Sequence, residues 1–221
     1  MAVIALGTVG GLTDLGTICL HVASLWPHPP LVVEADPDGG RLAARHDWDL
    51  RPSLGDLVAL LNSYETTAIS IDRVTRRLRN GVRVVVAPPA MEAVHSVLCD
   101  VVPTLSNLES RTMGDVLIDV GVVRPDSPAR DIIAAASKRI IVVRKDVEDL
   151  VALAHRRSLL ESLGTWSVLT AGGRLRSADA IGAIRWPILA DLLPNDRRSS
   201  AVLRASLTRF ATDPERSRQP I

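Results

Sequence analysis

Four carboxylates follow apolar runs at positions where they could hold a metal ion or orient a water molecule. The stretch LVVEADPDGG carries Glu34, Asp36 and Asp38 at the end of one apolar run, and Asp119 ends the run VLID. A magnesium–nucleotide site uses such carboxylates, one to hold the metal through water and another to position the attacking water. The same residues also have a structural interpretation, because Asp, Pro and Gly suit a reverse turn and an aspartate can end a strand.

A glycine-rich segment near the start of the chain has the pattern of a phosphate-binding loop. The apolar residues 3–6 lead into Gly7 to Gly16, and an apolar helical pattern follows. Backbone N–H groups at such a helix N-terminus favour an anion. A phosphate-binding loop also carries a lysine, but the two lysines of this chain are Lys138 and Lys145. Glycine-rich turns also join strands to helices without a ligand, so the segment predicts the frame of a phosphate site without its charge.

Short apolar runs alternate with longer amphipathic segments, and these elements must position the candidate residues. Strands are predicted at 3–6, 31–35, 82–87, 115–123, 139–144, 166–171 and 184–189. Helices are predicted at 13–26, 53–63, 91–102, 129–137, 147–163 and 201–211, and the helix at 91–102 is expected to end near Pro103. Strands without polar alternation, separated by helices, are typical of a parallel sheet covered on both faces. We therefore predict one doubly wound, mainly parallel α/β domain over 1–211 and a polar tail over 212–221.

The composition restricts the class of protein. The chain has 221 residues, of which 47% are hydrophobic, and 26 basic against 25 acidic residues give a net charge of +1. This balance argues against a general polyanion-binding protein, and no apolar run reaches the roughly 20 residues that a membrane span needs. Cys19 and Cys99 lie in apolar helical patterns and are predicted to be buried free thiols. The N-terminus lacks the positive flank of a signal peptide, so we expect a cytoplasmic protein.

The order of these segments resembles the ParA/MinD family of deviant Walker ATPases, which have a P-loop NTPase-like fold of the SIMIBI class. In that family a strand leads into KGGxGKT[ST], the next strand ends in DxDxQ, and a later strand ends in the Walker B aspartate. Here VGGLTDLG lies over the first motif, EADPDGG over the second and VLID over the third. The segments VVRKDVEDLVALAHRRSLLESL and WPILADLLPNDRRSSAVL resemble later parts of the family, so the resemblance reaches to about residue 210.

The resemblance implies an ATP and magnesium site, but its first motif departs from the family pattern. Gly10 and Gly11 match the two glycines of the family, which places the family's first lysine on Val9. The Walker lysine then falls on Asp14, or on Leu15 if one residue is inserted. A lysine at this place contributes roughly 4 kcal/mol per unit-charge contact at about 4 Å and an effective dielectric of 20, before desolvation. We therefore expect weak or absent ATP binding and no efficient hydrolysis.

The metal-binding positions are carried over from the same resemblance. The hydroxyl residue that binds Mg²⁺ falls on Gly16 or Thr17, and Asp119 takes the place of the Walker B aspartate. A threonine hydroxyl and a carboxylate are both suitable oxygen ligands for this ion. The resemblance therefore places a magnesium ion, if one binds, between Thr17 and Asp119.

The second motif supplies the remaining candidate residues. Glu34 stands at its first acidic position, Asp36 at the position of the water-positioning aspartate, and Asp38 in place of the glutamine. Without the lysine, Asp36 is expected to be only a vestige of a catalytic residue. Arg41 or Arg45, which follow this motif, could approach the site and replace the missing charge.

The resemblance implies a role in positioning cellular cargo, because the family positions plasmids, chromosomes, division sites, chemoreceptors and pili. Members such as the TadZ/CpaE branch, which localises pilus or secretion machinery, are atypical at the Walker motif. The leading hypothesis is therefore a positioning or adaptor protein with a degenerate nucleotide site, which acts by binding a protein partner and pairs as a homodimer. The alternative is an active ParA/MinD-type ATPase in plasmid or chromosome partition, with arginine in place of the lysine.

One basic stretch, DRVTRRLRNGVR, bears on the partition alternative. It contains Arg73, Arg76, Arg77, Arg79 and Arg83. Such a cluster can hold DNA by weak, non-specific and salt-sensitive phosphate contacts. The alternative interpretation is the solvated face of a helix, with its positive end at the helix C-terminus.

An apolar stripe near the C-terminus raises the question of membrane attachment, because MinD relatives end in a basic amphipathic helix. The stripe consists of Val202, Leu203, Leu207 and Phe210, with Arg204 and Arg209 beside it. A stripe of this kind usually docks on its own domain. We therefore expect no attachment to a membrane.

Overall fold

Eight strands form one sheet in the computed structural model, which describes residues 2–10, 14–63, 68–111, 114–175, 184, 186–192 and 197–213. The strands are β1 (Val3–Thr8), β2 (Leu31–Glu34), β3 (Arg76–Arg77), β4 (Arg83–Val85), β5 (Val116–Val122), β6 (Lys138–Val143), β7 (Ser167–Ala171) and β8 (Ile188–Leu192). Their order is β3-β4-β2-β5-β1-β6-β7-β8, and neighbouring strands are parallel except for β3 and β4. The predicted doubly wound, mainly parallel α/β fold is confirmed.

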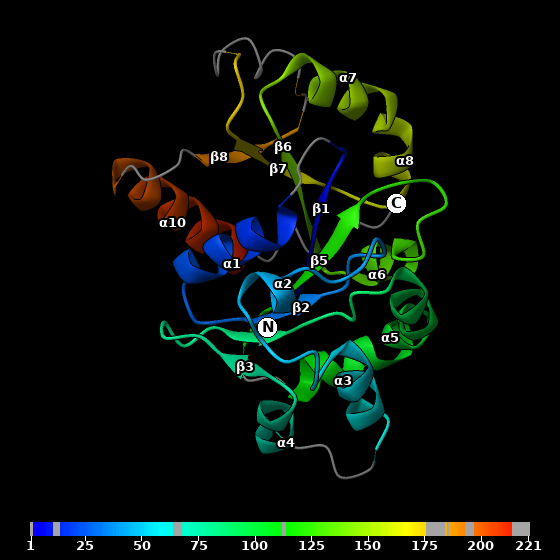
Figure 1. Ribbon diagram of the computed structural model, residues 1–221. Coiled ribbons are helices and arrows are strands. Elements are labelled where there is room, and N and C mark those ends of the chain that lie inside the picture. The colour runs from blue at the N-terminus through cyan, green and yellow to red at the C-terminus, as the bar shows by residue number, and fades with distance from the viewer. Residues whose placement is uncertain are drawn as a thin grey trace.

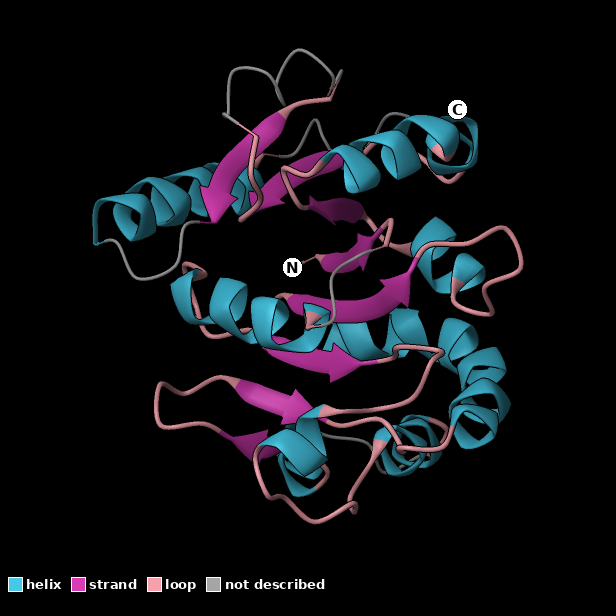
Figure 2. Cartoon of the chain, turned by 45° about the horizontal axis from the view of Figure 1, so that its top comes forward, coloured by secondary structure: helices cyan, strands magenta, loops and turns pink. Residues whose placement is uncertain are grey.

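Helices cover both faces of this sheet (Figures 1 and 2). The described helices are α1 (Leu15–Leu25), α2 (Leu42–Arg45), α3 (Leu54–Leu61), α4 (Ala68–Arg73), α5 (Met91–Arg111), α6 (Arg130–Ala135), α7 (Val147–His155), α8 (Arg157–Ser162) and α10 (Arg197–Thr212). Helices α1, α2 and α10 pack in the core of one face, and α3, α5, α6, α7 and α8 pack in the core of the other. Burial on both faces explains why the strands are apolar without alternation.

The parallel register brings two of the candidate carboxylates to one level of the sheet. Asp119 of β5 lies beside Leu6 of β1 on one side and beside Glu34 of β2 on the other. Leu6 and Leu117 both belong to the core on the α1 face. Because successive side chains of a strand point to opposite faces, Asp119 points to the same face as Leu117. The carboxyl ends of β2 and β5 therefore present their acidic side chains toward the start of α1.

Helix α5 continues through Pro103 to Arg111, so the prediction that it ends near this proline is wrong. A proline inside a helix removes one backbone hydrogen bond and clashes with the preceding turn. The apolar face nevertheless continues at helical spacing on both sides of the proline, and it buries Val94, Leu98, Val101, Leu105 and Leu108. Packing of this long face against the sheet offsets the local cost of the proline.

The predicted helix over 147–163 is divided into α7 and α8 at Arg156, where the backbone leaves the helical region (φ −93°, ψ 6°). The guanidinium of Arg156 donates a hydrogen bond to the carbonyl of Val9, directly after β1. Leu153 on α7 and Leu160 on α8 are both buried, so each half packs on the sheet separately. The Arg156 hydrogen bond therefore connects the corner between α7 and α8 to the beginning of the glycine-rich loop.

The arginine-rich stretch forms an antiparallel hairpin at one edge of the sheet, which contradicts its interpretation as one helix face. Arg76 donates hydrogen bonds to three backbone carbonyls of the segment 49–52. Arg77 and Arg83 both pair with Asp72, at 3.0 Å and 3.2 Å. Much of the positive charge of this stretch is therefore engaged within the domain.

The C-terminal helix α10 is docked on the domain by its apolar stripe. Of the stripe residues, Leu203, Leu207 and Phe210 are buried, and Val202 is exposed. The ring of Phe210 meets the ring of Trp26 edge-on, with 6.3 Å between their centroids. The buried ammonium of Lys138 donates to the carbonyls of Phe210 and Ala211 at 2.5 Å and 2.9 Å, which places a positive charge at the helix C-terminus. Among the described residues, no helix has the length and hydropathy that crossing a bilayer requires.

The two cysteines have different surroundings. Cys19 is fully buried in α1, where burial, and then the nearby charges of Asp119 and Glu34, raise the pKa of its thiol well above 9.0. Cys99 is exposed on α5, so the prediction of two buried thiols is wrong for this residue. Cys99 follows the buried Leu98, and successive helical residues are about 100° apart around the axis, which turns Cys99 away from the sheet.

Candidate functional site

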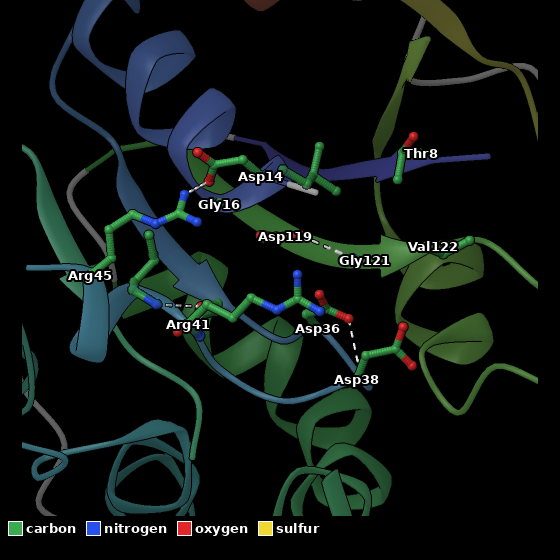
Figure 3. A pocket seen from close by; sticks show the side chains of 13 residues that line it. Thr8, Asp14, Gly16, Asp36, Asp38, Arg41, Arg45, Asp119, Gly121 and Val122 are labelled. Atoms are coloured by element: carbon green, nitrogen blue, oxygen red, sulfur yellow. Dashed lines mark hydrogen bonds and ion pairs between the residues drawn. The ribbon is translucent and has the colours of Figure 1, made fainter. Parts of the chain in front are cut away.

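A cavity of about 50 Å³ lies at the carboxyl edge of the sheet, between the starts of α1 and α2 and the end of β5 (Figure 3). Its lining includes most of the predicted site residues, namely Asp14, Leu15, Gly16, Glu34, Asp36, Asp38, Arg41 and Asp119, together with Arg45. Thr17 lies on the first turn of α1 and Gly10 follows β1, but neither belongs to the lining. Gly11 lies outside the described residues. The fold thus brings acidic residues of three separate segments to one cavity.

Asp14 is the N-cap of α1. Its carboxylate accepts a hydrogen bond from the backbone N–H of Thr17 at 3.1 Å. The same carboxylate forms an ion pair with the guanidinium of Arg45 at the end of α2 (Figure 3). Arg45 also donates to the hydroxyl of Thr17 at 2.8 Å. An aspartate is a favourable N-cap because it satisfies a free N–H and complements the helix dipole. The place where a phosphate group would meet α1 therefore already holds a carboxylate.

In the second alignment, the position of the Walker lysine is taken by Leu15, whose side chain is buried. Leu15 is 5% exposed and packs in the core beneath α1. Val9, the position of the family's first lysine, is 1% exposed and belongs to the core of the opposite face. Both positions are therefore filled by packing residues.

The two lysines of the chain have structural partners away from this cavity. Lys138 caps the C-terminus of α10, as described above. Lys145, just after β6, forms a buried ion pair with Asp191 of β8, and the hydroxyl of Thr170 donates to the same carboxylate at 3.0 Å. These contacts place both ammonium groups in the packing of the sheet and its last helix.

Glu34 is a structural carboxylate in this arrangement. It is 2% exposed, and one oxygen accepts hydrogen bonds from the backbone N–H groups of Arg41 and Leu42 at 2.7 Å and 3.0 Å. Its other oxygen accepts from the N–H of Ala87 at 2.9 Å. Burial raises the pKa of Glu34, and the three N–H groups oppose that rise. Glu34 thus ties the end of β2 to the start of α2 and to the segment after β4.

Asp36 and Asp38 form a turn that is joined to the end of β5. The carboxylate of Asp36 accepts from the N–H of Asp38 at 3.0 Å, and Arg124 donates two hydrogen bonds to Asp38 at 3.1 Å and 3.2 Å. Gly121 (φ +64°) allows the Asp36 carboxylate to lie against the backbone of β5, because a Cβ at this position would lie 2.1 Å from an Asp36 oxygen. Burial raises the pKa of Asp36. Arg124 was missed by sequence reasoning, although it follows β5 by two residues just as Asp36 follows β2.

Asp119 is, together with Glu34, one of two buried acids that line the cavity. It is 2% exposed, and one oxygen accepts from the N–H of Gly121 at 3.0 Å. Burial, and then the charges of Asp36 and Glu34, raise its pKa from 3.8 to about 8, while the N–H of Gly121 and the charge of Arg41 oppose that rise. At neutral pH this carboxyl group is therefore mainly protonated, a form that is a poor ligand for a cation.

These described residues do not fit Mg-ATP as they are arranged. Five carboxylates line the cavity against two arginines, and its volume of about 50 Å³ is well below the roughly 300–1,000 Å³ of small-molecule pockets. No three side chains of His, Cys, Asp or Glu within the described part of the chain are grouped so that they could hold a metal ion. The predicted magnesium residues are engaged otherwise, because the Thr17 hydroxyl accepts from Arg45 and Asp119 is mainly protonated.

Comparison with known proteins relates this chain to solved structures only, since neither a family model nor a curated protein matches it. A ParA family ATPase from Chlorobium tepidum TLS has a TM-score of 0.69 at 13% identity, over 95% of this chain and 98% of that chain. A chain of the MinC:MinD cell division protein complex of Aquifex aeolicus also reaches a TM-score of 0.69 at 13% identity, over 100% of this chain and 98% of that chain. MinD with Mg-ADP from Pyrococcus horikoshii OT3 reaches 0.63 at 15% identity, over 96% and 90%. The chain therefore has the fold of the ParA/MinD ATPases over nearly its whole length.

Proposed function

We propose that this protein is a ParA/MinD-like positioning or adaptor protein with a degenerate nucleotide site. It binds a protein partner and so localises a cellular machine, such as a pilus or secretion apparatus. The observation that carries the proposal is the Asp14–Arg45 ion pair at the N-terminus of α1. A carboxylate at this place repels phosphate, and the guanidinium of Arg45, which lines the same cavity, is already paired with it.

The contacts around the cavity support partner binding that does not depend on a nucleotide cycle. Asp14–Arg45 joins the start of α1 to α2, and Asp38–Arg124 joins the turn after β2 to the segment after β5. In a nucleotide-driven switch, bound phosphate and metal hold such loops in one arrangement and release them after hydrolysis. Here the chain supplies its own connections between the loops. The MinC:MinD complex shows that a protein of this fold can bind a protein partner.

Calorimetry and phosphate release with Mg-ATP test the degenerate site. We expect no measurable heat of binding in the micromolar range and no phosphate release above the buffer rate. MinD of Pyrococcus horikoshii, whose structure holds Mg-ADP, serves as the positive control in the same cell. Tight binding with steady turnover by the wild-type protein would refute the proposal and direct attention to Arg41 and Arg45 as substitutes for the lysine.

Localisation in the native cells tests the adaptor role. A fluorescent fusion should form a discrete focus that coincides with a labelled pilus or secretion ATPase and persists when cellular ATP is depleted. We also propose that two copies pair through the cavity edge, which light scattering on the purified protein measures. A signal spread over the nucleoid that disperses on ATP depletion would instead support the partition alternative.

The partition alternative also requires DNA binding, and the hairpin arginines allow a specific test. Arg76, Arg77 and Arg83 are engaged within the domain, whereas Arg73 and Arg79 are exposed. We expect any DNA binding to be weak, and the double change Arg73→Glu and Arg79→Glu should remove it without affecting the fold. Gel-shift titrations at low and physiological salt measure this, since phosphate contacts weaken steeply with salt. Tight binding at physiological salt that survives both changes would favour partition.

A further inference from the structure

The donors around Asp14 and Arg45 are those of an anion-binding site, and the carboxylate of Asp14 occupies it. Helix α1 has 11 residues, and the carboxylate of Asp14 receives an N–H of its first turn. The guanidinium of Arg45 contacts the same carboxylate (Figure 3), and it also donates to the hydroxyl of Thr17. Helix N–H groups, a guanidinium and a hydroxyl are the donors that proteins use to bind phosphate groups. In this chain the N–H and the guanidinium converge on a side-chain carboxylate, and the hydroxyl accepts from the same guanidinium.

A second, independent observation on the same cavity points to a missing ligand. Asp119 lines the cavity and is 98% buried, and one of its oxygens accepts from the N–H of Gly121. Its other oxygen has no hydrogen-bond partner among the described residues. Buried polar atoms in native proteins are nearly always hydrogen-bonded. The unpaired oxygen therefore marks a polar space beside the start of α1, since it lies 3.4 Å from the position that a Cβ on Gly16 would take.

The exposure of the pair decides what it can do. The side chains of Asp14 and Arg45 are 41% and 38% exposed. Ion pairs at this exposure contribute little to stability and open readily, because water and salt screen both charges. The contact joins α1 to α2 but adds little to the stability of the fold. Its main consequence is that the donors of Arg45 and of the first turn of α1 are kept from other anions.

We propose that the Asp14–Arg45 contact is autoinhibitory: the Asp14 carboxylate occupies the position of a phosphate group and keeps Arg45 from binding one. The inference rests on the proposed function, because it supposes that the unmodified site binds no nucleotide. It goes beyond that function by assigning the block to one side chain, while the donors beneath remain competent for a phosphate or pyrophosphate group. Removing the charge of Asp14, with its capping hydrogen bond retained, should therefore open the site.

The test is calorimetry with inorganic pyrophosphate, without divalent metal, on the full-length protein. Asp14→Asn removes the charge but keeps a good N-cap, and Asp14→Ser is a second neutral cap. We expect both variants to bind pyrophosphate at least tenfold more tightly than the wild type. The double variant Asp14→Asn with Arg45→Gln should lose this gain, because the gain depends on the freed guanidinium.

Asp38→Asn is the matched control, since it removes the same charge from the lining of the same cavity without touching α1. It should improve pyrophosphate binding by less than threefold. Equal gains for Asp38→Asn and Asp14→Asn, or no gain for both neutral caps in folded protein, would overturn the inference. A gain that survives Arg45→Gln would also overturn it. A failure of this kind leaves the proposed function intact, whereas Mg-ATP binding and turnover by the wild type contradict the proposed function itself.

Discussion

Two cation–carboxylate pairs lie at the carboxyl edge of the sheet, and they differ in depth. The side chains of Lys145 and Asp191, between β6 and β8, are 7% and 25% exposed, and Thr170 adds a hydrogen bond to the pair. The side chains of Arg45 and Asp14, at the start of α1, are 38% and 41% exposed. The Lys145–Asp191 pair (the deep pair) is mostly buried, where a single charge without a counter-ion has a high desolvation free energy. The Asp14–Arg45 pair (the outer pair) is in contact with solvent, which screens both charges.

This difference separates a structural role from a ligand-related one. Removal of one partner from a buried pair leaves a buried charge without its counter-ion. Replacing one member of the deep pair alone should therefore lower the stability of the fold strongly. Removal of one partner from the outer pair leaves a charge that water solvates, so stability changes little. Changes to the outer pair should therefore affect anion binding more than stability, and changes to the deep pair should affect stability. Variants at the two pairs measure this contrast.

The largest effect is expected for Lys145→Met. The change leaves Asp191 partly buried without its cation and should lower the free energy of unfolding by about 3 kcal/mol, the lower end for a broken buried pair because Asp191 keeps some exposure. Urea denaturation followed by circular dichroism measures it. The double change Lys145→Met with Asp191→Leu should recover part of the loss. A loss below about 1 kcal/mol, as at a surface pair, would remove the contrast.

Asp119→Asn examines the buried acid of the cavity that the outer pair lines. The pKa of Asp119 is raised from 3.8 to about 8 by burial and neighbouring carboxylates. Between these values the folded protein keeps a proton that the unfolded chain has lost, so this group makes stability fall as pH rises from about 4 to about 8. Asparagine cannot ionise and can still accept from Gly121.

The measurement is urea denaturation of wild type and Asp119→Asn across this pH range. At pH near 7 the variant should be more stable by about 2–3 kcal/mol, because the unfolded chain has lost this proton and the folded protein has kept it, and near pH 5 the two should agree within about 0.5 kcal/mol. The same difference at both pH values would mean that ionisation of Asp119 is not its cause.

Asp14→Ala separates the capping role of the outer pair from its charge. Loss of the N-cap should cost about 1 kcal/mol, whereas Asp14→Asn keeps the cap and should cost only a few tenths. Thermal and urea denaturation of the two variants, side by side, give the difference. If alanine and asparagine are equally destabilising, the charge rather than the hydrogen bond to Thr17 holds α1 at this end.

The smallest effect is expected for Arg45→Gln, which breaks the outer pair and leaves the cap. The free energy of unfolding should fall by less than about 1 kcal/mol, and the change should shrink further in high salt. Denaturation at low and high ionic strength measures both. A loss comparable to that of Lys145→Met would show that the outer pair is structural and would count against an autoinhibitory role.

The sheet could be predicted from sequence because its strands are apolar on both faces. The runs that form β1, β2, β5 and β6 have few polar residues, and such runs between helices imply parallel pairing. The edge hairpin of β3 and β4 was not predicted as a pair, because an arginine-rich turn carries no strand periodicity. The full length of α5 was also missed, since local proline chemistry predicted an end that distant packing overrides.

The acidic part of the cavity could likewise be predicted, because the carboxyl ends of parallel strands meet at one edge. Glu34, Asp36 and Asp119 were found in this way. The partners of these acids could not be found. Arg124 reaches Asp38 across 86 residues, and Arg45 reaches Asp14 across two loops, so both contacts depend on how the finished fold brings the segments together. Sequence spacing shows where a strand ends but not which distant side chain approaches it.

The capping role of Asp14 makes this position hard to change one residue at a time. A lysine there, which would supply the charge expected of a phosphate loop, cannot accept the N–H of Thr17 and would stand beside the guanidinium of Arg45. The single replacement would thus lose a helix cap and bring two positive charges together. A lysine at position 14 is expected to be tolerated without loss of stability only after Arg45 has been replaced. Directed evolution toward nucleotide binding should therefore begin at Arg45 or vary both positions together, since libraries restricted to position 14 have to cross a disfavoured intermediate.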